Sequence, residues 1–188
     1  MIIEPIESRL SVPSRQLGAP GPDSEQLQAL MHAALRVPDH GKLEPWRLIL
    51  IRGGARMRFG AALAEIHARI DTDVPDSVLE KDRTRYTFAP LIVAVIARIT
   101  ANHPKVPVQE QILSSGCVAY NLLLGAQALG FGAQWLTGWA AYDRDVAALL
   151  GLADNESVIA FVHIGSSGSA GIERTRPQVD ALVSDWDG

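Results

Sequence analysis

Residues 36–53 read RVPDHGKLEPWRLILIRG and carry the densest local information in this 188-residue chain. The first part is polar and contains two prolines and a glycine, which predicts a loop after a helix. WRLILIR at residues 46–52 is short and apolar, and glycines follow it, which predicts a strand. Loops fixed between rigid elements are where binding groups concentrate, so Asp39, His40, Lys42 and Glu44 are candidates. The plainer alternative is a capped helix with a solvated turn.

The residues around this stretch alternate between helical and strand patterns. Asp23 or Ser24 is expected to cap a helix that runs toward Pro38. Further helices are expected at residues 56–70, 77–86, 108–129 and 143–150, and strands at 90–98, 134–138 and 157–165. Residues 116–128 are apolar on nearly every side, which predicts a central buried helix with Cys117 as a small core residue. Without a repeat or linker, residues 1–188 are expected to form a single domain, α/β or α+β.

The C-terminal end is unusual because it is apolar. Val179, Leu182, Val183 and Trp186 are unfavourable in water and must pack against something. Two alternatives follow: the tail packs on its own domain, or it packs on a partner subunit.

Composition excludes several classes of protein. With 47% hydrophobic and 20% charged residues the chain is not disordered, and its net charge of −4 argues against a nucleic-acid partner. The apolar runs are shorter than the ~20 residues of a membrane span, and the N-terminus has no secretory pattern. A single cysteine excludes an intrachain disulfide framework. We therefore expect a cytoplasmic protein with no membrane partner.

Searches for common catalytic motifs find none. The five histidines lack metal-ligand spacing, no serine lies in a nucleophile elbow, and no phosphate-binding P-loop is present. The glycine-rich residues 125–132 close a helix rather than open one, so they are interpreted as a C-cap. From composition alone, the scattered arginines would be surface residues.

Three segments resemble the flavin-dependent NAD(P)H nitroreductase family, most of all its short, minimal branch. RVPDHGKLEPWR is similar to the branch's R-x-P-D-H…P-W-R pattern. Residues 9–11 fall where that branch has Arg-Arg-Ser, and GFGAQWLTG at residues 130–138 resembles the family's late strand. The order of elements agrees, so the resemblance covers essentially the whole chain.

The resemblance implies an α+β sandwich with a mixed central sheet, long flanking helices and an intertwined homodimer. FMN would lie at the dimer interface, in a nitroreductase-like domain that spans residues 1–188. The implied reaction is ping-pong transfer of hydride from NADH or NADPH through FMN to a nitroaromatic, quinone or similar small molecule. The cofactor carries the chemistry, so no catalytic side chain and no metal are expected.

The resemblance also implies which residues bind the cofactor. Arg9, Leu10 and Ser11 would hold the phosphate or ribityl chain, and Arg174 or Arg176 would be a second phosphate ligand. Arg36, His40 and Lys42 would contribute from the loop, and Trp135, Leu136 and Thr137 from the other side of the pocket.

The chain departs from the family pattern at two positions. Leu10 replaces the second arginine of Arg-Arg-Ser, and Glu44 stands where glutamine is common. These departures leave two alternatives open: a non-catalytic flavin carrier or sensor of the same fold, and an interaction protein that shares only the fold.

Overall fold

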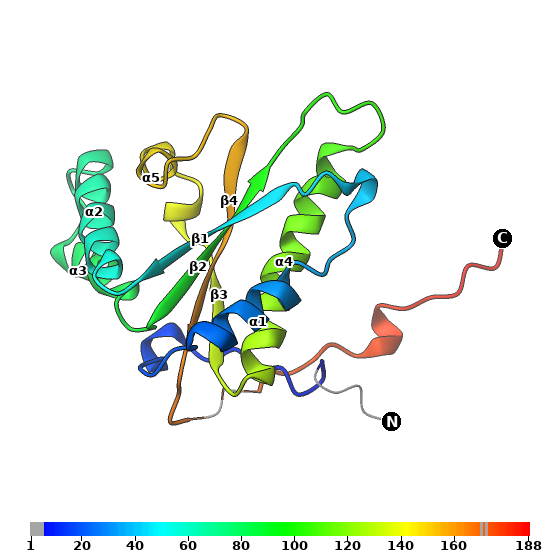
Figure 1. The fold of residues 1–188 in the computed structure, drawn as a ribbon, viewed down its shortest axis with the longest axis horizontal. Coiled ribbons are helices and arrows are strands. Elements are labelled where there is room, and N and C mark those ends of the chain that lie inside the picture. Colours follow the sequence, from blue (N-terminus) through cyan, green and yellow to red (C-terminus); the bar gives the residue numbers. More distant parts are fainter. Residues whose placement is uncertain (1–5, 170, 172) are drawn as a thin grey trace.

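The computed structural model describes residues 6–169, 171 and 173–188, and a four-stranded sheet lies at its centre (Figure 1). The strands are β1 (Trp46–Arg52), β2 (Leu91–Arg98), β3 (Gly132–Leu136) and β4 (Glu156–Gly165). They lie in the order β1-β2-β4-β3. The inner strands β2 and β4 are the most apolar and the most deeply buried.

All three strand pairings among the described residues are antiparallel. Helices α2 (Ala55–Ile70) and α3 (Asp76–Arg85) both lie between β1 and β2, so the chain returns to the end of the sheet where β1 finished. A single helix, α4 (Val108–Ala128), connects β2 to β3, a connection that is typical of two parallel strands that are neighbours in a sheet. Here β2 and β3 are not neighbours, because β4 lies between them. The α+β class is therefore confirmed, whereas the sheet of this one chain is not mixed as expected.

Helices cover both faces of the sheet (Figure 1). Helices α1 (Ser24–Ala34) and α4 pack on one face, where Val93 and Val95 of β2 point. Helix α2 and a short helix, α5 (Arg144–Leu149), pack on the other face, against Ile92 and Ile96. Because side chains alternate along a strand, the continuous apolar run of β2 fills both cores.

Most predicted boundaries agree with the structure to within two residues. Asp23 caps α1 through a capping box with Gln26, whose amide donates to the Asp23 carboxylate at 2.8 Å. The helix ends at Ala34, before Pro38. Strand β3 begins two residues earlier than predicted, at Gly132, where a Cβ would lie 2.8 Å from the Leu17 side chain.

Helix α4 differs from its prediction. One side packs on the sheet, but the other carries Ile112, Leu113, Cys117 and Tyr120 in exposed positions, with Leu113 60% exposed. We call these four residues the α4 stripe. The expectations of a fully buried helix and of a core Cys117 are therefore wrong for the single chain. None of the helices in the described part of the chain is long and apolar enough to span a membrane.

The C-terminal tail extends away from the body of the molecule (Figure 1). Val179, Leu182 and Val183 are exposed, and Trp186 is 91% exposed. The alternative in which these side chains pack on their own domain is therefore wrong.

Candidate functional site

Two of the predicted cofactor-binding segments, residues 9–11 and the loop with His40, lie near opposite ends of α4. Near the C-terminal end, the Leu10 amide donates to Gln127 Oε1 at 3.0 Å. In the first turn, His40 Nδ1 lies 2.7 Å from Glu110 Oε2. At a rise of about 1.5 Å per residue, these two contacts are roughly 25 Å apart along the helix. One chain therefore does not bring His40 together with residues 9–11.

The N-terminal segment lies along the outer edge of β3. The Val12 amide donates to the Ala133 carbonyl at 3.0 Å, and the Ser14 amide donates to Gln134 Oε1. Arg9 Nη1 donates to Ser11 Oγ at 3.2 Å. These contacts place the segment that contains residues 9–11 beside the strand that carries Trp135 and Leu136.

A hollow of about 390 Å³ opens beside this segment, and we call it the hydroxyl hollow. Its lining combines serine hydroxyls with glycines: Ser8, Ser167, Ser169, Gly130, Gly132, Gly168 and Gly171, together with Leu10 and Gln127. A Cβ at Gly171 would lie 2.7 Å from the Leu10 Cβ, so glycine allows the chain after β4 to return close to residue 10. Hydroxyl donors and close backbone suit a phosphate.

Arg174 and Arg176 line neither the hydroxyl hollow nor the second hollow described next. Both are exposed, and Arg176 Nη2 lies 2.8 Å from Glu173 Oε1. Their role as second phosphate ligands stays a prediction.

A second hollow, of about 530 Å³, lies between the N-terminal segment, α3 and β3, and we call it the cationic hollow. Its polar lining comprises three cations and three hydroxyls, with no carboxylate: Arg15, Lys81, Arg85, Ser14, Ser77 and Thr84. The wall is completed by Pro13, Gln134, Leu136 and Phe88. In a chain with net charge −4, this local excess of positive charge favours an anionic or electron-rich ligand.

Sequence reasoning missed the three cations of this hollow. The signal was weak: Arg15 follows Ser11 in the same segment, and Lys81 and Arg85 are four residues apart, which places them on one face of a helix. Only the folded chain, in which α3, β3 and the N-terminal segment surround the same hollow, brings the three side chains together.

Two buried rings lie near the cationic hollow. His163 of β4 is fully buried, pairs across the strands with Gln134, and has no hydrogen-bond partner for either ring nitrogen within the described residues. Burial, with the charge of Arg85 as a second and smaller cause, lowers the pKa of His163 to about 4. Burial also raises the pKa of Tyr86, whose ring centroid is 5.2 Å from that of His163. Both rings are neutral at pH 7, so neither supplies a counter-charge to the hollow.

The loop at the other end of α4 has a strained backbone. Lys42 and Glu44 adopt φ values of 55° and 46°, a region that side chains other than glycine rarely occupy. Asp39 holds this conformation, because its carboxylate accepts from the Leu43 amide at 3.1 Å and from the Glu44 amide at 2.9 Å. Strain of this kind persists where surrounding contacts over-determine it, and it concentrates at functional sites.

Two serines of α4 anchor the same loop. Ser114 Oγ donates to the Pro38 carbonyl at 2.7 Å and accepts from Trp46 Nε1 at 3.1 Å. Ser115 Oγ donates to the Pro45 carbonyl at 3.0 Å. Both ends of the loop are thus tied to one rigid helix, which fixes the place of His40.

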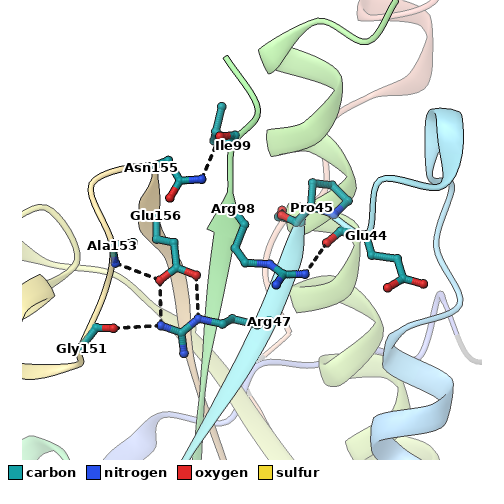
Figure 2. A network of polar contacts seen from close by, with 10 residues as sticks. Glu44, Pro45, Arg47, Arg98, Ile99, Gly151, Ala153, Asn155 and Glu156 are labelled. Atoms are coloured by element: carbon teal, nitrogen blue, oxygen red, sulfur yellow. Dashed lines mark hydrogen bonds and ion pairs between the residues drawn. The ribbon is translucent and has the colours of Figure 1, made fainter. Parts of the chain in front are cut away.

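Beyond the loop, Arg47 forms a two-pronged ion pair across the sheet (Figure 2). Its Nε and Nη2 donate to the Glu156 carboxylate at 2.7 and 2.8 Å, and Arg98 donates to the Glu44 carbonyl at 3.1 Å. The hydrogen bond from Arg47 is the main cause that lowers the pKa of Glu156, and the same bond raises the pKa of Arg47. Arg47 is therefore committed to the fold, whereas Arg36 in the same stretch is exposed.

The chain matches the model of the nitroreductase family over residues 6–166. It is 34% identical over 151 residues to the Escherichia coli protein named "Putative NAD(P)H nitroreductase YdjA", covering 80% of this chain and 81% of that one. It is 35% identical over 153 residues to the Haemophilus influenzae protein named "Putative NAD(P)H nitroreductase", covering 81% and 82%.

Solved structures share the fold. The nitroreductase-like protein of Bacillus cereus superposes with a TM-score of 0.80 at 20% identity, over 97% of this chain and 94% of that one. The FMN-dependent nitroreductase NfnB of Mycobacterium smegmatis, solved with NADPH, gives a TM-score of 0.76 at 17% identity, over 96% of each chain.

The chain belongs to the nitroreductase family. The resemblance drawn from the sequence and the nitroreductase-like fold are thereby confirmed. Among the residues that the structure describes, no group of three or more histidine, cysteine or acidic side chains could hold a metal ion.

Proposed function

We propose that this protein is an oxidoreductase that uses FMN to pass hydride from NADH or NADPH to a small-molecule acceptor such as a nitroaromatic or a quinone. Family membership supports the reaction class. The observation that carries the proposal is the pair of hollows beside β3, one rich in hydroxyls and one rich in cations without a carboxylate. FMN has a phosphate at one end and, at the other, a ring system that gains negative charge on reduction.

The residues of the hydroxyl hollow would bind the phosphate and ribityl chain. Ser167 and Ser169 of the lining offer hydroxyl donors, and Arg9 and Ser11, which are neighbours of Leu10 in sequence but do not line the hollow, would add a guanidinium and a further hydroxyl. Such donors offset the cost of taking a phosphate out of water. The backbone amide of Leu10 already donates to Gln127. Leu10 would therefore contact the cofactor through its side chain, or its amide would have to release Gln127 before it could donate to the cofactor.

The residues of the cationic hollow would bind the ring system. Bound FMN supplies the hydride chemistry. Arg15, Lys81 and Arg85 would stabilise the negative charge that the ring gains on reduction, and the chain of residues 135–137 would hold it in place. The fixed walls orient the reactants and exclude water, so no side chain has to act as a nucleophile.

A homodimer would complete the site. The loop with Arg36, His40 and Lys42 lies roughly 25 Å along α4 from residues 9–11, so it serves a cofactor only when a second copy brings its own loop to the hollows of the first. The exposed α4 stripe and the apolar tail supply surface that such a copy would bury.

The remaining expectations belong to the same proposal. We expect residues 1–188 to act as one FMN-binding domain in the cytoplasm, where an exposed thiol such as that of Cys117 stays reduced. The acidic net charge does not favour a nucleic-acid partner, and we propose none.

The test begins with the visible absorbance spectrum of the purified protein and of the supernatant after heat release, followed by NADH or NADPH without oxygen. Released FMN, bleaching on the protein and reoxidation by a quinone or nitroaromatic are expected. Bound FMN that neither pyridine nucleotide reduces would favour the carrier or sensor. A colourless protein that takes up no FMN would overturn the proposal.

A further inference from the structure

The ring of His40 is held by a carboxylate from another element. Its Nδ1 lies 2.7 Å from Glu110 Oε2 in the first turn of α4. An ionised carboxylate can only accept, so Nδ1 carries the hydrogen of this bond. Among the hydrogen bonds of the described residues, the ring takes part only through Nδ1, which leaves Nε2 available for a ligand.

The backbone beneath His40 is equally fixed. In the described part of the chain, the non-glycine residues with positive φ are Lys42 and Glu44, two and four positions after His40. Asp39, the acidic neighbour in sequence, is occupied by the Leu43 and Glu44 amides, so it does not compete with Glu110 for the ring. The backbone of the loop and the contact with Glu110 together fix the orientation of the His40 ring, and therefore the direction in which its Nε2 points.

Burial does not explain the pair. The His40 and Glu110 side chains are 55% and 47% exposed, and an exposed pair of this kind contributes little to stability. Ordering both side chains costs conformational entropy, so a benefit to a bound ligand is the better explanation.

We propose that Glu110 is a positioning residue: it fixes the rotamer and the protonated nitrogen of His40, so that Nε2 points to the FMN held by the second copy. This inference rests on the proposed function and on its dimer. The competing explanation is that Glu110 stabilises the α4 N-terminus, where a negative charge is favourable in any case.

Three substitutions of Glu110 separate these explanations. Glu110→Asp keeps the charge at the helix terminus but shortens the reach to His40. Glu110→Gln loses the charge but keeps the length and an oxygen that can accept from Nδ1. Glu110→Ala loses both. A positioning role predicts that FMN affinity falls most for the alanine and aspartate variants and least for the glutamine variant, whereas helix stabilisation predicts that the aspartate variant equals the wild type.

The experiment measures the dissociation constant of FMN, the thermal midpoint without cofactor, and the imidazole ¹⁵N shifts of His40. We expect Glu110→Ala to weaken FMN binding about three- to tenfold, the effect of losing one neutral hydrogen bond. The thermal midpoint should change little, the ¹⁵N shifts should show that Nδ1 loses its hydrogen, and the H40N background should abolish any further effect of Glu110→Ala.

The outcomes distinguish the two proposals. A wild-type protein that takes up no FMN overturns the proposed function and this inference together. If the wild type binds FMN, then equal losses from Glu110→Ala in the wild-type and H40N backgrounds, or unchanged binding by Glu110→Asp, overturn the positioning role alone.

Discussion

The two ends of helix α4 lie beside different structural features, a hollow at one end and a strained loop at the other. Near its C-terminal end, the hydroxyl hollow lies beside Gln127, whereas the cationic hollow lies farther along β3, where α3 and not α4 completes the wall. At its N-terminal end, one short loop is strained and is held by hydrogen bonds from Asp39, Ser114 and Ser115. The hollows offer volume and positive charge, and the loop presents a single histidine. We propose that they are two parts of one composite site, and the length of α4 keeps the loop of a chain away from the hydroxyl hollow of the same chain.

The largest expected effect comes from separating the two copies. Leu113→Lys places a charge in the α4 stripe, where the side chain is 60% exposed in the single chain and would be buried in the dimer. We expect a monomer by light scattering and an FMN affinity reduced at least about a hundredfold. The matched control is Leu149→Lys on α5, which is also an exposed leucine but lies outside the stripe. A monomeric Leu113→Lys variant with wild-type FMN affinity would contradict the composite site.

The next effect concerns His163, behind the cationic hollow. The pKa of its ring is lowered to about 4 in the folded chain, against a usual value near 6.5, so protonation favours the unfolded state. The neutral ring's contribution to stability is complete above pH 6.5 and is lost as the pH falls toward 4, by about 3 kcal/mol in total.

Urea unfolding at pH 7 and at pH 4.5 measures this dependence. His163→Met fills similar volume without polar nitrogens, so it should remove this part of the acid sensitivity and raise stability at pH 7 by about 1 kcal/mol. Equal acid sensitivity in the wild type and in His163→Met would show that the ring is not the group responsible.

A smaller effect is expected from the cationic hollow itself. Arg85→Gln removes a charge from its wall while keeping most of the length of the side chain. We expect FMN affinity to fall about tenfold and the midpoint potential of bound FMN to become more negative. Arg83→Gln is the control on the same helix, because Arg83 is exposed and pairs with Glu80. Identical potentials for both variants would exclude the hollow as the place of the ring system.

The smallest effect concerns strain in the loop. Lys42→Gly should remove the backbone strain at a φ of 55°, which raises the free energy of unfolding. The glycine also adds entropy to the unfolded chain, which lowers it, so we expect a net rise of about 0.5 kcal/mol. Lys105→Gly, in a loop without positive φ at the lysine, should instead lower it by a similar amount. Thermal melts of both variants measure the difference, and a loss of stability in both would mean that the loop is not strained.

Local rules predicted the elements well. Periodicity predicts the order of the helices and strands, and it predicts that β2 is buried on both of its faces. Capping residues predict where α1 begins. The exposed face of α4 was not predictable, because an apolar helix face gives the same sequence pattern whether or not the core of its own chain covers it. The antiparallel order was missed because β4, the last strand in sequence, is inserted beside β2.

The candidate site could be predicted in part. The loop and residues 9–11 were proposed from their motifs, which are local, and their role in cofactor binding stays a prediction. Arg15 and Arg85 belong to segments 70 positions apart, and only the pairing of Val12 with Ala133 and the packing of α3 bring them together. The positive φ of Lys42 and Glu44 gives no signal, because glycine or asparagine is expected at such positions.

Complementation between two inactive variants tests the composite site most directly. Arg85→Ala breaks the hollow and His40→Ala breaks the loop, so each homodimer is impaired at both sites. If the site spans two copies, a mixed dimer has one site with both defects and one site with none. Unfolding and refolding an equal mixture should then restore about a quarter of the wild-type FMN sites and NAD(P)H-dependent turnover. A mixture no more active than its components, although mixed dimers are present by mass spectrometry, would show that each site is built from one chain.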